Sequence, residues 1–535
     1  MRKLFKNIPI LIVLLAGLRL SAQPAVQFEE HDLTYVLNPW LHTKNAAGLG
    51  LSTVKFHGIT ELGYNIAKGD LHRAQEGNEQ NGLNFYSERY DKLAKNWTSW
   101  GSFNFIMDRE KNRAWSDVMN TYNNNPYIFG SSVPGSYDRQ LFDFHVKISS
   151  KPTGNITYGL GIDYQVGDLS RLRDPRTRVF LADYAVLPAV TFRLNEKHFI
   201  GLNLNARYQK EKMPGISTVQ DDPNLRYYTF FGMENADAVI GGFKGFQRQF
   251  VSSYYGGDVQ YSFVSTNSQF LISGGVYNQN QQILENIKQS PGTFNALNYK
   301  GSIVFNTKLS SLLLNLTATA NARQAAANEN IQELKSVNDP NTGVNSQTWV
   351  TLFTYKNQYI NNSYDAKLRL DIRNINEDKN DFSWLGGIEA GVNGFENKYN
   401  LPYSAMRINR MHAGVYGQYR LLKLNEHRLT LKGNFDYVTS FDNMLQLRNG
   451  VTNMPVTGAS TFTIGTYDIA TNVLLPDFNF YNTNVFQFKL ETKYSLPLNF
   501  KKVKMIGYVR AYYGQSITNS LGSWSNGGVA FGIIP

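Results

Sequence analysis

The chain has 535 residues, a formal net charge of +11 and no cysteine. The lack of cysteine excludes disulfides, thiolate metal sites, a cysteine nucleophile and a lipoprotein anchor. Phe and Tyr number 33 and 32, and both residue types are enriched in strands and at membrane interfaces. No nucleic-acid-binding motif accompanies the positive charge, so nucleic acid is not an expected partner.

Residues 1–22 have the features of a secretory signal peptide. Arg2, Lys3 and Lys6 precede an apolar run from Ile8 to Leu18, which is too short to span a bilayer. Ser21-Ala22 offers a cleavage site that leaves Gln23 as the mature N-terminus. A membrane anchor is the alternative, and the short run makes it the weaker one. We therefore expect an exported protein.

Beyond the signal peptide, strand-length segments alternate apolar and polar residues. From Asn155 to Val166 every second residue is apolar and the residues between are polar or glycine. Successive side chains of a strand point to opposite faces, so each segment predicts one apolar and one polar sheet face. A soluble sandwich alternates in the same way. The recurrence along almost the whole chain, together with the export signal, favours a transmembrane antiparallel β-barrel in the outer membrane of a Gram-negative bacterium.

Eight tight polar turns divide the chain into hairpins. They are Ala94-Lys95-Asn96, Lys151 to Gly154, Asn195 to His198, Thr266 to Ser268, Lys308 to Ser311, Glu377 to Asn380, Leu424 to His427 and Asn499 to Lys502. Longer connections lie between them, among them Asn112 to Ser136, Met213 to Gln249, Ala326 to Ser346 and Gln446 to Tyr481. The pattern predicts one domain, residues 53–535, with about 18 strands in a range of 14–18 and both ends periplasmic.

The polar faces of these strands carry charges of both signs. The residues expected to line the lumen are Asp143, His145, Lys147, Asp163, Arg207, Lys367, Arg369, Asp371, Arg373, His412, Arg420, Lys432, Asp436, Lys489, Glu491 and Lys493. Facing lipid, a charge near the midplane costs about 2–4 kcal/mol, so these residues should point inward. Opposed charges across a pore select polar solutes. Alternatively, they pair with one another and line a wet interior.

Residues 23–52 form a segment before the first strand. Its candidate gate residues are Asn38, Pro39, Trp40, Asn45, Gly48 and Gly50. The segment is much shorter than the folded plug of energy-coupled receptors, so we expect a passive or gated route rather than TonB-dependent uptake. The alternative is a periplasmic leader packed against the barrel mouth.

The stretch from Asn45 to Gly50 resembles the Asn-Pro-Ala-Gly-Leu element near the start of fatty-acid-transporter-like barrels, with Ala46 in place of Pro. The resemblance implies a hatch inside the barrel and lateral exit of a hydrophobic substrate, for which Leu187-Pro188 is the place to look. Over its whole length the chain resembles outer-membrane barrel proteins of Bacteroidota, through the Ser21-Ala22-Gln23 junction and the Asn- and Tyr-rich strands. That resemblance implies location rather than chemistry.

Enzymatic activity is not expected. A phospholipase-type barrel needs an outward Ser-His pair, yet His145 and His412 lie on polar faces and His198 and His427 in short turns. An omptin-like protease needs Asp-His pairs at the outer rim, where only Asp70 and His72 come together. The irregular spacing of His31, His42 and His57 does not favour a metal or haem site, so no cofactor is expected.

The sequence therefore predicts a porin-like channel, passive or gated, for a small solute. The two alternatives are a hydrophobic-substrate transporter and a non-transporting barrel that assists a surface complex. Expected partners are outer-membrane lipid, lipopolysaccharide and a surface lipoprotein. The aromatic residues between Met213 and Gln249 either fold inward as a constriction or dock a partner; they are Phe230, Phe231, Phe243 and Phe246.

Overall fold

The computed structural model describes residues 31–52, 57–94, 96–220, 226–240, 245–338, 345–376, 381–424, 427–448, 453–454, 464–465, 469–500 and 503–535. The predicted signal peptide and residues 23–30 of the predicted gate segment lie outside these ranges. Among the described residues, no helix has both the length and the apolar character needed to cross a bilayer.

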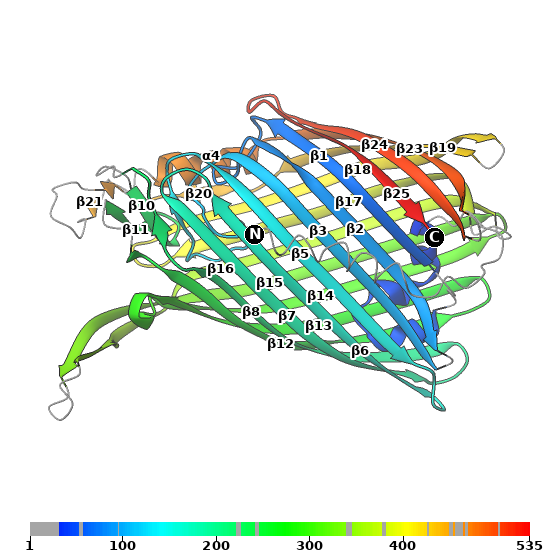
Figure 1. Cartoon of the computed structure of the whole chain (residues 1–535), viewed down its shortest axis with the longest axis horizontal. Coiled ribbons are helices and arrows are strands. Elements are labelled where there is room, and N and C mark those ends of the chain that lie inside the picture. The colour runs from blue at the N-terminus through cyan, green and yellow to red at the C-terminus, as the bar shows by residue number, and fades with distance from the viewer. Residues whose placement is uncertain are drawn as a thin grey trace.

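Eighteen antiparallel strands close into one barrel (Figure 1). They are β1 (His57–Gly69), β2 (Glu79–Ala94), β3 (Trp97–Arg113), β5 (Gly135–Ser150), β6 (Ile156–Arg171), β7 (Arg176–Arg193), β8 (His198–Met213), β12 (Arg248–Val264), β13 (Ser268–Glu285), β14 (Gly292–Leu309), β15 (Leu312–Asn338), β16 (Asn345–Asn376), β17 (Asp381–Tyr399), β18 (Ser404–Leu424), β19 (His427–Ser440), β23 (Val485–Phe500), β24 (Val503–Ile517) and β25 (Ser523–Ile534). The first and last strands pair from Thr60↔Ile533 to Gly69↔Trp524. Closure leaves the barrel wall without a free edge, and the predicted fold class is confirmed.

The short connections gather at one end of the barrel, on the right in Figure 1. Four predicted turns lie between paired strands, at 151–154, 195–198, 266–268 and 308–311. The other four include residues outside the described ranges, but each follows one barrel strand and precedes the next. We call this end the short-turn mouth and the opposite end the loop mouth.

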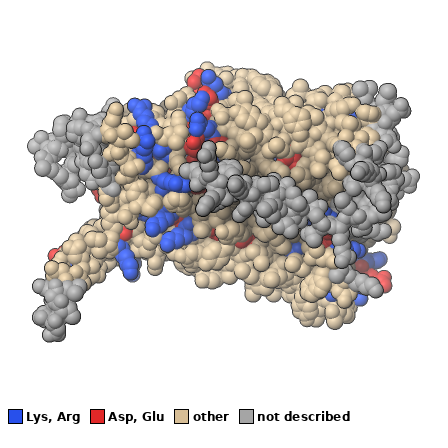
Figure 2. Space-filling view, viewed as in Figure 1, with Lys and Arg blue, Asp and Glu red and all other residues tan. Residues whose placement is uncertain are grey.

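The outer surface of the barrel wall is apolar, as the alternation predicts. On β6 the side chains of Tyr158 and Ile162 are exposed on the outer face. Thr157 of the same strand points to the opposite, inner face and is buried. Figure 2 shows a largely uncharged surface over the middle and right of the barrel, with Lys and Arg gathered towards the loop mouth. An uncharged apolar belt of this kind is what a lipid bilayer requires of a barrel exterior.

One predicted connection is wrong. The Asn-rich stretch from Ala326 to Ser346 is not a loop, because β15 and β16 continue through most of it as a paired hairpin. The pairs run from Glu329↔Tyr355 to Asn338↔Asn345, and the hairpin projects beyond the loop mouth (Figure 1). Asn is typical of turns, but here cross-strand backbone hydrogen bonds outweigh that local preference.

Smaller elements fold around the loop mouth. They comprise the strands β4 (Phe129–Ser131), β9 (Ile216–Ser217), β10 (Arg226–Gly232), β11 (Asn235–Ile240), β20 (Met444–Gln446), β21 (Asn453–Met454) and β22 (Ile464–Gly465), with the helices η4 (Asn286–Lys288), η6 (Ala470–Leu474) and α4 (Leu475–Asn482). β11, β10 and β4 form a small separate sheet. The largest buried apolar cluster of the described residues lies here rather than in the middle of the lumen.

Candidate functional site

Residues 31–52 lie inside the barrel at the short-turn mouth. They form α2 (His31–Leu37), η1 (Pro39–His42) and η2 (Ala46–Leu51), seen in dark blue in Figure 1. Pro39 suits the first position of η1, since its fixed φ is compatible with a helical turn and its missing N–H is not needed there. Asn45 caps η2 by accepting a hydrogen bond from the backbone N–H of Gly48. We call residues 31–52 the inner plug.

Asn45 attaches the inner plug to the barrel wall. Its side chain is fully buried, and its Nδ2 donates to Val190 O at 3.2 Å and to Gln260 Oε1 at 2.9 Å. Gln260 in turn donates to Asn203 Oδ1 at 2.8 Å. A buried amide is stable only when its polar atoms are paired, so this network holds the plug in one position.

Glycines of the wall let the plug approach closely. A Cβ on Gly159 of β6 would lie 2.1 Å from the backbone nitrogen of Ala47. A Cβ on Gly201 of β8 would lie 2.9 Å from the Trp40 ring, and one on Gly48 would lie 2.4 Å from that ring. The predicted gate residues Trp40, Asn45 and Gly48 are therefore packed as one unit, which only glycine at these positions permits.

Further contacts join the inner plug to strands on both sides of the short-turn mouth. Lys147 Nζ donates to Thr43 O at 2.6 Å, and Ser149 Oγ donates to Ala47 O at 3.1 Å. On the far wall, Leu33 and Val36 pack against a cluster from β15 to β18; its members are Leu313, Ile375, Phe382, Leu385 and Tyr416. Of the other predicted gate residues, Asn38 accepts from Ser52 Oγ at 3.1 Å. Gly50 lies where a Cβ would be 3.0 Å from Ser149 Oγ.

A buried carboxylate, Glu88 of β2, also holds the plug. It accepts hydrogen bonds from Tyr35 of the plug and from Tyr86 of the same strand. Trp100 Nε1 donates to the same carboxylate at 3.1 Å. Three donors compensate the desolvation of a charge that is 4% exposed.

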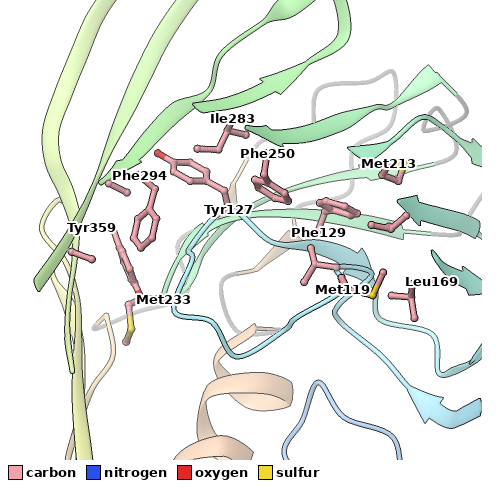
Figure 3. Packing of buried hydrophobic residues seen from close by; sticks show 14 of the residues in the cluster. Met119, Tyr127, Phe129, Leu169, Met213, Met233, Phe250, Ile283, Phe294 and Tyr359 are labelled. Carbon is pink, nitrogen blue, oxygen red and sulfur yellow. The ribbon is translucent and has the colours of Figure 1, made fainter. Parts of the chain in front are cut away.

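The loop mouth is filled as well. The aromatic residues predicted to fold inward or to dock a partner fold inward where the structure describes them: Phe230 is buried in one apolar cluster, and Phe231 and Phe246 pack on a second, larger one. Phe243 lies outside the described residues. Figure 3 shows Phe129 of β4 beside Phe250 of β12, with ring centroids 6.0 Å apart and planes 12° from parallel.

Buried polar groups tie the loops together at this mouth. Asp117 accepts from Tyr227 Oη at 2.8 Å and from Tyr137 Oη at 2.5 Å, and it faces Arg171 at 3.6 Å. All four side chains lie among apolar residues, so their mutual pairing is what makes the cluster stable.

A second polar hub joins the first loop, residues 70–78, to α4. Asp477 accepts hydrogen bonds from Ala74 N at 2.7 Å and from Tyr122 Oη at 3.1 Å. Arg73 lies 3.6 Å above the Tyr122 ring and donates to Tyr481 Oη at 2.9 Å. Burial raises the pKa of Asp477 to about 7. The hub therefore changes its charge near neutral pH.

The predicted lumen residues fall into two groups, of which the first is paired. His145 lies between Asp143 at 3.2 Å and Asp163 at 2.7 Å. The further contacts of this group are Arg207 with Asp183, Lys367 with Glu389 at 2.6 Å, His412 with Glu389 at 3.7 Å, Arg373 with Asp371 at 2.7 Å, Arg369 with Tyr416 Oη at 2.6 Å, and Arg420 with Phe382 O at 2.6 Å. Asp436 lies beside Gly414 on the adjacent strand.

The second group lines a cavity. Lys432, Lys489, Glu491 and Lys493 surround a space of about 370 Å³ together with Glu61, Tyr86, Tyr508 and Arg510. The latter four, like Glu88, Asp183 and Glu389, were not among the predicted lumen residues. Asp183 is hard to find because β7 carries apolar residues on both faces: Leu181 and Leu187 are buried inside, while Tyr184 and Val186 are exposed outside.

The wall at Leu187-Pro188 shows a local irregularity. β7 pairs with β8 up to Val186↔Ala206 and again from Ala189↔Asn203, without pairs at Leu187 and Pro188. Proline has no N–H to donate, so the interruption is expected. On the other side, both residues pair with β6, as Leu160↔Pro188 and Gly161↔Leu187. The strands stay adjacent across this site.

Three of the histidines contact groups other than carboxylates. His198 bonds to Tyr261 Oη at 2.7 Å, His427 bonds to Tyr494 Oη at 2.7 Å, and His72 bonds to the carbonyl of Arg73 at 2.9 Å rather than to the Asp70 carboxylate. Among the described residues, no group of three or more His, Asp or Glu side chains is arranged to hold a metal ion.

Comparison with solved structures finds distant barrels. The iron transporter FrpB of Neisseria meningitidis is 10% identical, with a TM-score of 0.37 over 92% of this chain and 83% of that one. A FadL homologue of Pseudomonas aeruginosa is 8% identical, with a TM-score of 0.31 over 92% of each chain. The siderophore receptor PirA of P. aeruginosa is 7% identical, with a TM-score of 0.34 over 90% and 81%.

Among curated proteins, no significant match was found. A family model does match, over residues 46–534, which is nearly the whole barrel together with η2 of the inner plug. The chain therefore belongs to a family of unknown function, DUF6850.

Proposed function

We propose that this protein is a gated outer-membrane channel for a small polar solute. The observation that carries the proposal is a lumen with a charged cavity between two filled mouths: the inner plug occupies one end and the folded loops the other. The apolar exterior and the export signal support an outer-membrane location. Filled mouths favour a gated route over an open pore.

The inner plug is built to dock rather than to seal permanently. It is held by non-covalent contacts, namely side-chain hydrogen bonds and small apolar clusters, and it precedes β1 in the chain. Because the inner plug is short, weakening these contacts together should release it from the wall as a unit. Opening also requires the loop mouth to yield, where Arg73 and Asp477 hold α4 against the first loop.

The test is conductance in planar bilayers, with four proteins. They are the mature chain, a variant lacking residues 23–43, the double variant Arg73→Ala/Asp477→Ala, and the combination. We expect silence from the mature chain, at most brief openings from each single-end change, and steady current from the combination. Each variant must first show barrel circular dichroism and heat-modifiable migration on gels.

Two results would overturn the proposal. Large steady currents from the mature chain mean an open pore and remove the gate. Silence from the folded combination variant means that the barrel does not conduct.

A non-transporting barrel that assists a surface complex is the second candidate. It is favoured by the hairpin that β15 and β16 extend beyond the loop mouth, which exposes Ile331, Leu352 and Phe353. Exposed apolar residues on a projecting hairpin are typical of binding surfaces. This candidate gains weight if the combination variant stays silent while removal of residues 330–354 abolishes association with a surface protein.

A further inference from the structure

The lumen cavity of about 370 Å³ is lined by more cations than anions. Its charged residues come from four strands; they are Glu61 on β1, Lys432 on β19, Lys489, Glu491 and Lys493 on β23, and Arg510 on β24. Four positive and two negative side chains leave an excess of two positive charges. A wall of a wide barrel usually balances such charges locally, so the excess needs an explanation.

The two carboxylates are already engaged. Arg510 bonds to Glu61 through Nε at 3.2 Å and to Glu491 through Nη1 at 3.3 Å. Tyr508 Oη also donates to Glu61 Oε2 at 2.8 Å. Arg510 is therefore paired with both carboxylates. Its positive charge offsets one of the two negative charges, and one negative charge remains beside the three lysines.

The three lysines have no carboxylate partner among the described residues. Lys489 Nζ lies 4.5 Å from the Tyr512 ring centroid, and Lys493 Nζ lies 4.7 Å from that of Tyr508. Lys432 sits directly across the strand pair from Glu491, whose contact is with Arg510. Elsewhere in the lumen, Lys367 forms an ion pair with Glu389 at 2.6 Å. The three lysines at the cavity differ from Lys367 in lacking such an ion pair with any described carboxylate.

We propose that this cavity binds a small organic anion. Ammonium groups with spare donors on two adjacent strands recognise carboxylate or phosphate oxygens through charge-assisted hydrogen bonds. The volume lies at the low end of that of small-molecule sites, about 300–1,000 Å³, which excludes a large chelate or an oligosaccharide. Tyr86 and Tyr508 provide ring surface for the carbon part of the ligand.

The inference rests on the proposed function, since it names the class of solute that the channel carries. Glu491 and Glu61 hold Arg510 by hydrogen bonds, and all three residues line the cavity together with the three lysines. An anion there removes the uncompensated charge, whereas a cation or a neutral sugar does not.

The experiment is equilibrium binding by titration calorimetry in detergent, on the mature chain and in parallel on the variant lacking residues 23–43, in which access from the short-turn mouth is not limiting. The probes are succinate, its neutral isostere succinamide, and inorganic phosphate. We expect succinate to bind and succinamide not to, with affinity falling as KCl rises. Phosphate binding as tight as that of succinate points to a phosphorylated solute, and weaker phosphate binding points to a carboxylate.

Variants localise the binding. Lys432→Gln, Lys489→Gln and Lys493→Gln should each weaken succinate binding about tenfold, while Arg at the same positions should retain it. Lys367→Gln is the matched control, because Lys367 also faces the lumen but is paired outside the cavity. Equal binding of succinamide, or equal loss with Lys367→Gln, overturns the inference.

Binding and conduction are separate readouts. Conduction without succinate binding leaves the channel proposal intact and refutes the anion site. Succinate binding without conduction supports the site and refutes the channel.

Discussion

Replacing Asn45 with Ala should release the inner plug while leaving the barrel folded. The Asn45 side chain makes three hydrogen bonds: two as donor, to Val190 O and Gln260 Oε1, and one as acceptor from Gly48 N. All three are buried or partly buried, and only the last lies within the plug. The barrel strands keep their backbone hydrogen bonds, so the substitution should lower the free energy of plug docking rather than the stability of the barrel.

The size of the change in docking free energy follows from the hydrogen bonds lost and from the polar atoms left without a partner. Each lost hydrogen bond costs about 0.5–1.5 kcal/mol, and a buried acceptor left without a partner costs about 1–3 kcal/mol. Gln260 keeps its bond to Asn203 through Nε2, so only its Oε1 loses a donor. We therefore take about 3 kcal/mol for the substitution, or roughly a hundredfold shift towards the undocked plug, since about 1.4 kcal/mol is tenfold.

The assay is protease access at Lys44, next to Asn45 in the plug. Trypsin cleavage after Lys44 should accelerate roughly a hundredfold in Asn45→Ala if cleavage follows the undocked population. Asn434→Ala is the matched control, since β19 lies across the barrel from β7 and β8. Cleavage of Asn45→Ala at the control rate would refute the idea that this amide holds the plug.

Three further changes test other parts of the structure. Gly159→Ala should displace the plug, because its Cβ would overlap the Ala47 backbone, while Gly433→Ala meets nothing within 4 Å and should not; trypsin access at Lys44 again measures this. The loop mouth should loosen as pH rises from about 4 to 7, because Asp477 has a pKa of about 7 when docked and an ordinary one when released, so docking binds the proton; the hydrogen-exchange protection factors of residues 469–482, corrected for the intrinsic pH dependence of exchange, should fall over this range and stay constant in Asp477→Asn. Asp117→Ala should remove the carboxylate that accepts from Tyr227 and faces Arg171 and destabilise the loop mouth by about 3–5 kcal/mol, seen as a lower thermal midpoint.

The barrel could be predicted because its physics repeats at every strand. Each segment places apolar residues outward and polar residues inward, and each tight polar turn marks a hairpin, so local information recurs along the chain. The prediction failed where that rule fails. Alternation does not reveal Asp183 on β7, because the lumen face around it is apolar, with Leu181 and Leu187 buried beside it. It also misread residues 326–346, where polar residues form strands that extend beyond the wall.

The plug could be located but not oriented from the sequence. Asn45 and Gly48 stand out in the chain, yet the residues that receive the plug are distant in sequence and ordinary in type: Gly159, Gly201 and Glu88. A glycine in a strand has many explanations, and only the approach of another backbone shows which one applies. Docking of the plug depends on contacts between residues far apart in the sequence, and local sequence patterns do not reveal such contacts.

The hydrogen bond between Tyr86 and Glu88 links the cavity to the inner plug. Tyr86 lines the cavity and donates to Glu88, and Glu88 also accepts from Tyr35 of the plug. An anion that recruits the Tyr86 hydroxyl takes one donor from Glu88 and leaves the carboxylate to Tyr35 and Trp100. Such an exchange changes the docking free energy of the plug, and by linkage plug release changes the affinity of the cavity by the same factor. The two sites are then coupled through Glu88, so Glu88→Gln should weaken the dependence of plug release on succinate. Solute recognition and opening would thereby depend on the same hydrogen bonds.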